Sequence, residues 1–132
     1  MAPETAPTDE DVDDFLASIT SMRLQGDARV LDGIFRRVTG SPPVMWGASI
    51  VGYGAKVLMY ADGRSADWMA LGFAPRTSKL AIYGLGDVPG RAQLLARLGP
   101  HSTGASCVYV PSMAAIDATV LEELARAAIA HD

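Results

Sequence analysis

Apolar residues recur every three or four positions along the N-terminal part of the chain, which is the spacing of amphipathic helices. The first helix is predicted to begin after Thr8, an N-cap followed by acidic residues, and to end at Gly26. Its inward positions are Val12, Phe15, Leu16, Ile19 and Met22. The second is predicted from Asp27 to Gly40, where the following prolines stop it, and its inward positions are Leu31, Ile34, Phe35 and Val38.

The middle of the chain has the shorter period of strands. Residues 56–61 predict one strand, an Asp-Gly pair predicts a hairpin turn, and residues 67–74 predict the returning strand. A turn at 75–78 then leads to a third strand at 79–85. Connections this short suit antiparallel neighbours and not parallel crossovers, so the three strands are expected to form a meander.

The last third of the chain returns to helical spacing around one further strand. A short helix is predicted at Arg91–Leu98, a strand at Cys107–Val110, and a final helix from an Asp117 cap to Ile129. The sum is an α+β domain, in which a mainly antiparallel sheet packs against N-terminal and C-terminal helices. Residues 1–7 are expected to be a disordered tail, and residues 8–132 a single domain.

Composition narrows the class of protein. The chain has 132 residues, 49% of them hydrophobic, which is enough for one domain with an apolar core. A single cysteine, Cys107, excludes an internal disulfide, and no signal or membrane-spanning pattern occurs, so a cytoplasmic location is expected. The net charge of −4 and the scattered basic residues argue against nucleic acid and anionic membranes as partners.

Four motifs follow one another along the chain: Met45 to Gly54 (MWGASIVGYG), Gly63 to Trp68 (GRSADW), Gly72 to Arg76 (GFAPR) and Leu98 to Cys107 (LGPHSTGASC). In this order they resemble the YdhG-like domains, a family of unknown function. The resemblance covers about residues 15–129 and implies a compact α+β domain. Some relatives are labelled frataxin-like intracellular iron chaperones, which implies ferrous iron as one ligand. Relatives often carry lysines where this chain has Pro100, Ser102 and Ala105.

The loop at residues 99–106 is the first candidate binding segment. Its glycines allow backbone N–H groups to converge on an anion, and Thr103 and Ser106 add hydroxyl donors. His101 adds a group that titrates near neutral pH. The alternative is an ordinary connection whose small polar residues satisfy the backbone.

Aromatic residues form the second candidate, because they gather in the middle of the chain around the glycine-rich stretch that contains Ser49. If they surround one concavity, with Arg76 and Lys79 at its rim, they suit an apolar or planar ligand that carries a negative group. The aromatic residues are Trp46, Tyr53, Tyr60, Trp68, Phe73 and Tyr83. The alternative is that these rings form the core face of the sheet.

An acidic run near the N-terminus is the third candidate. On a helix that includes them, Asp9 and Glu10 would share a face with Asp13 and Asp14, and such oxygen ligands suit ferrous iron or hard cations. The alternative is a solvated helix start, where acidic side chains complement the helix dipole.

These candidates leave several functions open. The leading hypothesis is a non-enzymatic module that binds a small anionic or aromatic ligand. The alternatives are an iron-binding chaperone and a domain that self-associates, as a homodimer, or binds a protein partner. No nucleophile–base pattern identifies a catalytic residue, and the sequence identifies no cofactor. Cys107 lies in an apolar strand and is expected to be a core residue.

Overall fold

The computed structural model describes residues 7–47, 49–59, 61–63, 65–77, 79–85, 88–104 and 107–131. Four helices alternate with two groups of strands along the chain. The helices are α1 (Val12–Ala17), α2 (Met22–Thr39), α3 (Arg91–Leu98) and α4 (Ala118–His131). The strands are β1 (Pro43–Trp46), β2 (Ile50–Tyr53), β3 (Lys56–Met59), β4 (Ser65–Trp68), β5 (Leu71–Pro75), β6 (Leu80–Tyr83), β7 (Ser102–Thr103) and β8 (Cys107–Val110).

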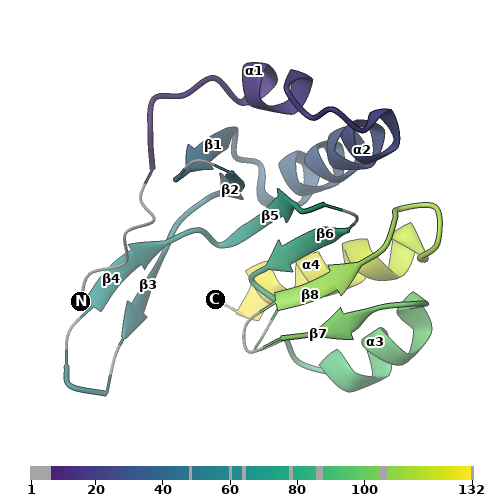
Figure 1. Cartoon of the computed structure of the whole chain (residues 1–132). Helices are drawn as coiled ribbons and strands as arrows, with labels where there is room; N and C mark the ends of the chain where they lie inside the picture. The colour runs from purple at the N-terminus through teal and green to yellow at the C-terminus, as the bar shows by residue number, and fades with distance from the viewer. Residues whose placement is uncertain are drawn as a thin grey trace.

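Six of these strands form one antiparallel sheet, in the order β1-β2-β5-β6-β8-β7. The strands β3 and β4 form a separate two-stranded hairpin, which projects to one side of the sheet (Figure 1). The expected α+β class is therefore confirmed. The expected meander is wrong in detail, because residues 67–74 belong to two strands: β4 pairs with β3, and β5 pairs with β2 and β6.

Helices α2 and α4 cover one face of the six-stranded sheet (Figure 1). The side chains of that inner face, among them Val51, Phe73, Ile82 and Val108, are completely buried in a continuous apolar core. Burial of apolar area on this scale is the main favourable contribution to folding. The opposite, outer face of the sheet carries no such helix pair, and it holds the candidate site described below.

The predicted boundary between the first two helices is wrong. The first helix ends at Ala17, and α2 begins after Ser21, whose side-chain oxygen accepts a hydrogen bond from the Leu24 backbone N–H at 3.2 Å. Gly26 therefore lies inside α2. A mid-helix glycine costs about 1 kcal/mol, which packing of the helix against the core outweighs. The predicted end at Gly40 is confirmed, because Gly40 adopts a left-handed conformation with a φ of 67°.

The predicted N-cap of the first helix is also wrong. Asp11 caps α1, since its carboxylate accepts a hydrogen bond from the backbone N–H of Asp13 at 2.8 Å. Thr8 lies before the helix, and its backbone N–H donates to the Met45 carbonyl at 2.8 Å. The N-terminal segment thus runs beside β1, where Pro7 forms an isolated bridge with Trp46. The rest of the predicted tail, residues 1–6, lies outside the described residues.

Later elements agree closely with their predictions. The observed bounds of α3 and β8 are the predicted ones, and the Asp117 side chain caps α4 by accepting from the Thr119 backbone N–H at 2.9 Å. None of the described helices is both long enough and apolar enough to cross a membrane.

Two of the polar contacts between α2 and its neighbours involve a buried tyrosine and an ion pair with α4. The buried Tyr53 hydroxyl of β2 donates to Asp32, which also pairs with Arg36. Burial, followed by this hydrogen bond, raises the pKa of Tyr53 far above its ordinary value, so the hydroxyl stays protonated. Arg37 pairs with Glu122 of α4 at 2.8 Å. These contacts are on the helix side of the sheet, away from the candidate site.

Candidate functional site

A row of residues crosses the outer face of the sheet from β5 to β7. The strand register aligns Ala74 with Ala81, Ala81 with Tyr109, and Tyr109 with Ser102. Adjacent residues in such a row point to the same side, and here that side is opposite to the core residues Leu80 and Ile82. Small residues on β5 and β6 therefore lie next to a tyrosine and a serine.

Two cations from the turn between β5 and β6 reach into this row. The Arg76 backbone N–H donates to the Lys79 carbonyl at 2.8 Å, which closes the turn. The Arg76 guanidinium donates to the Tyr83 hydroxyl at 2.9 Å, and the Lys79 ammonium lies 4.6 Å from the centre of the Tyr109 ring. We call Arg76, Lys79, Tyr83 and Tyr109 the outer-face cluster.

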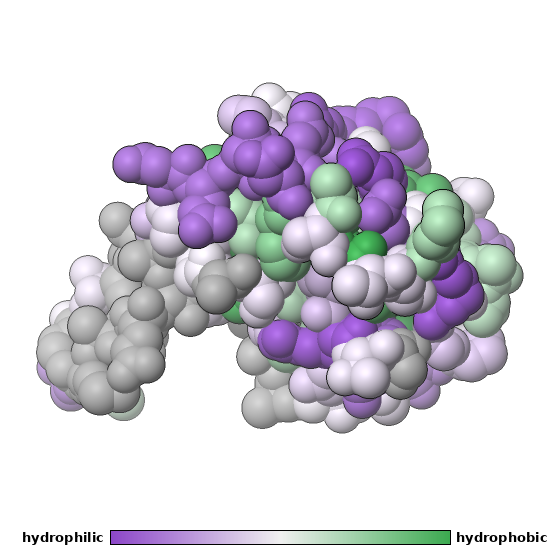
Figure 2. Space-filling view, turned by 45° about the horizontal axis from the view of Figure 1, so that its top comes forward, coloured by the Kyte–Doolittle hydropathy of each residue, from purple (hydrophilic) through white to green (hydrophobic). Residues whose placement is uncertain are grey.

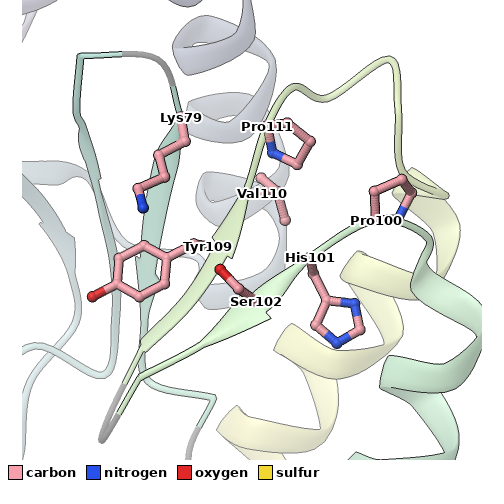
Figure 3. A pocket seen from close by; sticks show the side chains of 7 residues that line it. All are labelled: Lys79, Pro100, His101, Ser102, Tyr109, Val110 and Pro111. Carbon is pink, nitrogen blue, oxygen red and sulfur yellow. The ribbon is translucent and has the colours of Figure 1, made fainter.

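A hollow of about 310 Å³ opens beside the cluster, and we call it the Tyr109 hollow. Figure 3 shows the Lys79 side chain extending toward the Tyr109 ring, with Ser102 on the neighbouring strand and α4 behind the sheet. The loop between α3 and β7 and the end of β8 supply the other side. The lining residues are Lys79, Pro100, His101, Ser102, Tyr109, Val110 and Pro111.

The protonation of two of these side chains follows from their contacts. A hydrogen bond with the Cys107 side chain is the main cause that raises the pKa of Tyr109, so its hydroxyl is neutral at physiological pH. The Nδ1 atom of His101 lies 2.8 Å from the Gly99 carbonyl oxygen, which can only accept. Nδ1 therefore carries the hydrogen of this contact, and Nε2 makes no hydrogen bond within the described part of the chain.

The cations of the outer-face cluster differ from the other cations of the molecule. Within the described part of the chain, Arg76 and Lys79 have no carboxylate within ion-pair distance, a property shared only by Arg91 among the described Lys and Arg side chains. The cations that do have a carboxylate partner are Arg23, Arg29, Arg36, Arg37, Arg97 and Arg126. Two positive charges that extend from one turn thus have no carboxylate partner among the described residues.

A second hollow, of about 430 Å³, lies on the other side of the β5–β6 turn. Ser49, Pro75 and Arg76 line it, together with residues of the segment from Phe15 to Leu24. Arg76 and His101 therefore line different hollows, although Arg76 and Lys79 belong to one turn. Ser49 belongs to this second hollow and not to the Tyr109 hollow.

The described aromatic residues do not surround one concavity. Tyr53 and Phe73 are fully buried and stack on each other in the core, and Phe35 packs edge-on against Tyr53, so neither Tyr53 nor Phe73 is available to a ligand. Trp46 is 4% exposed, and its ring packs edge-on against Trp68 with ring centres 5.7 Å apart. These rings therefore take part in packing, as the alternative interpretation expected, and do not line a ligand site.

The glycine-rich stretch around Ser49 is a β-hairpin, because β1 and β2 pair antiparallel on either side of a turn. Glycines can allow a ligand to approach the backbone closely. At Gly52 the space is occupied by the protein itself: a β-carbon built there would lie 2.4 Å from the Cδ1 atom of Trp46. The close approach at Gly52 therefore serves the packing of a tryptophan ring.

The acidic run does not share one helix face. Asp9 and Glu10 precede α1, whereas Asp13 and Asp14 lie in its first turn. All four are exposed. Figure 2 shows hydrophilic residues, in purple, across the upper part of the molecule. No group of three or more His, Cys, Asp or Glu residues suited to a metal ion occurs in the described ranges.

Three remaining candidates do not add to the site. Thr103 is exposed on β7, where it pairs with Val108 and thus faces the other side of the sheet from Ser102. Tyr60 and Ser106 lie outside the described residues. Of the predicted binding residues, the fold therefore brings together Arg76, Lys79 and Tyr83, with His101 across the Tyr109 hollow.

Tyr109 is not among the predicted site residues, and Ser102 is included only as part of the candidate loop at residues 99–106. The available signal was the period of β8: Cys107 and Tyr109 alternate with the apolar residues Val108 and Val110, which places the tyrosine on the non-core face. Gly104 lies against this ring, since a β-carbon built at Gly104 would be 3.2 Å from the Cε2 atom of Tyr109.

Comparisons with known proteins add no functional information. The sequence matches no protein-family model, no curated protein and no solved structure. The likeness to the YdhG-like domains thus remains a resemblance in short motifs.

Proposed function

We propose that this domain binds small anionic molecules at the outer-face cluster and the adjoining Tyr109 hollow, without transforming them. One observation carries the proposal: Arg76 and Lys79 lie on one turn, and neither has a carboxylate partner in the described part of the chain. This is notable in a protein of net charge −4. Adjacent like charges repel, and an anion placed between them would relieve that repulsion.

The surroundings of the two cations support an organic anion over a free inorganic ion. Lys79 lies over the Tyr109 ring, and the hollow beside it holds about 310 Å³ between Pro100 and Pro111. Pockets for small molecules combine apolar walls with a few placed polar groups. Here the prolines supply the walls, and Lys79 and Ser102 supply the polar groups.

Binding is favoured over catalysis by the arrangement of the polar groups. A serine nucleophile needs a base within hydrogen-bond reach, and in the described residues the Ser102 hydroxyl has no hydrogen bond with His101. His101 instead directs Nδ1 to the Gly99 carbonyl. The arrangement of Ser102 and His101 therefore suits recognition of a charged ligand and not activation of a serine nucleophile.

The resemblance to YdhG-like domains belongs to the same proposal. Arg76 closes the motif Gly72 to Arg76, and His101 and Ser102 lie in the motif Leu98 to Cys107. Arg76 belongs to the outer-face cluster, whereas His101 and Ser102 line the adjoining Tyr109 hollow, so motifs from separate parts of the chain lie near one another. A shared ligand class among YdhG-like proteins would account for that convergence.

A thermal-shift screen of the full chain against small phosphates, sulfates and carboxylates tests the proposal. A ligand at one hundred times its Kd stabilises the folded state by about 2.7 kcal/mol. We expect at least one such anion to raise the Tm, and Arg76→Gln or Lys79→Gln to reduce that rise. Arg97→Gln is the matched control, because it removes one positive charge from the ion pair between Arg97 of α3 and Glu123 of α4. If no anion raises the Tm, or if all three variants respond alike, the proposal fails.

A further inference from the structure

The polar groups of the outer-face cluster and of the Tyr109 hollow are mainly hydrogen-bond donors. The Lys79 ammonium has three N–H donors, and the Arg76 guanidinium has further N–H donors besides the one that binds the Tyr83 hydroxyl. The Ser102 hydroxyl has no hydrogen bond to any other described residue, so its O–H is available as well. A phosphate monoester presents three strong acceptor oxygens, whereas a carboxylate presents two.

The charge on the cluster also distinguishes ligand classes. Arg76 and Lys79 both act on the surroundings of Tyr109: Lys79 lies over the ring, and Arg76 lies close enough to act electrostatically on the hydroxyl. An oxyanion placed beside Tyr109 is therefore attracted by both cations. A monoanion neutralises one of two positive charges, whereas a dianion neutralises both.

The size of the hollow limits the organic part of the ligand. At about 310 Å³ it lies near the lower end of the range for small-molecule pockets. Pro100 and Pro111 provide apolar contact there, and the aromatic ring of Tyr109 lies opposite them in Figure 3. A compact organic group fits this space, and a polymer would have to bind mostly outside it.

From donors, charge and size together, we infer that the outer-face cluster and the Tyr109 hollow recognise a small phosphate monoester in its dianionic form. The inference rests on the proposed function and specifies its ligand. The phosphate group lies between Arg76 and Lys79 beside Tyr109, and the organic group lies in the hollow toward Pro100 and Pro111.

Three small ligands with the same phenyl ring show whether the charge or the shape of the anionic group determines the affinity. Isothermal titration calorimetry of the full chain at pH 8 and constant ionic strength compares phenyl phosphate, a dianion, with the monoanions phenyl sulfate and benzoate. We expect phenyl phosphate to bind at least tenfold more tightly than phenyl sulfate, which has the same tetrahedral shape. Lys79→Gln should lower the affinity for phenyl phosphate about tenfold or more, as loss of a hydrogen bond to a charged group does.

The same experiment distinguishes the two ways of failing. If phenyl sulfate or benzoate binds as tightly as phenyl phosphate, the dianion inference is wrong and the proposed anion site remains. If none of the three probes binds, both are wrong. Arg97→Gln changes the net charge by the same amount as Lys79→Gln, and it should alter the affinity less than twofold. Equal losses in the two variants would place the phosphate away from Lys79 and overturn the inference.

Discussion

Gly52 of β2 faces the indole of Trp46, and replacing it with alanine tests how tightly the outer face is packed at that end. A methyl group at this position would lie 2.4 Å from Cδ1 and 2.6 Å from Nε1 of the ring. Carbon atoms in contact are normally about 3.5–4.0 Å apart, so the ring would have to move by roughly 1 Å or more.

The ring has little room to move. Trp46 is 4% exposed and packs against Trp68, and the new methyl would also lie 3.0 Å from the Met69 β-carbon. Overpacking of this kind costs typically about 1–3 kcal/mol. For a chain of this length, each kcal/mol lowers the Tm by roughly 4 °C. We therefore expect Gly52→Ala to lower the free energy of unfolding by about 1–3 kcal/mol.

Urea denaturation followed by tryptophan fluorescence measures this change. The midpoint should fall while the slope m stays unchanged, because the surface exposed on unfolding is the same. Gly33→Ala is the matched control: Gly33 lies inside α2, and no atom lies within 4 Å of a β-carbon built there. That variant should be more stable than the natural protein by about 0.5–1 kcal/mol. A Gly52→Ala midpoint equal to that of the natural protein would refute the packing argument.

Three further predictions concern single contacts. Tyr53→Phe removes the hydrogen bond to Asp32 and should lower the free energy of unfolding by about 1–2 kcal/mol in urea denaturation, whereas an unchanged midpoint would contradict this. Two arginines hold the pKa of Glu122 below its ordinary value, so its contribution to stability is present at neutral pH and is lost as the pH falls through that lowered pKa. The urea denaturation midpoints of Glu122→Gln and the natural protein should accordingly differ at pH 7 and become equal in acid. A difference that does not change with pH would show that it does not arise from the ionised Glu122 carboxylate. Gly104→Ala should displace the Tyr109 ring and weaken phenyl phosphate binding in calorimetry, with little loss of stability. An unaltered affinity would mean that the Tyr109 ring does not contribute to the binding site.

Local sequence signals located the C-terminal half of the fold well. Glycines bound α3 at both ends, and Pro111 ends the valine-rich strand β8. These signals permit few other boundaries, and both elements have the predicted bounds. The N-terminal half was harder, because a glycine was taken as a helix end. The packing of α2 carries the helix through Gly26, and the real break falls in the short polar segment that ends at Ser21.

The hairpin of β1 and β2 was missed for a related reason. Glycines at positions 47, 52 and 54 favour turns and weaken a strand pattern, although Val44, Met45, Ile50 and Val51 favour strands. In the fold, Gly52 makes room for a ring from the neighbouring strand, a requirement that no local pattern reveals. The candidate site was partly predictable: Arg76 and Lys79 were identified as rim residues, but their lack of carboxylate partners depends on tertiary contacts.

The two edges of the six-stranded sheet have a consequence for how the domain can meet other chains. Along β1, the segment before α1 already occupies the edge, with the Thr8 N–H bonded to the Met45 carbonyl and Pro7 bridged to Trp46. At the opposite side, β7 is only two residues long. Neither edge offers a long row of free backbone groups for an incoming strand. Removal of the first eight residues would unmask the β1 edge, and a shortened chain would gain a route to intermolecular sheet growth that the natural chain blocks with its own N-terminal segment.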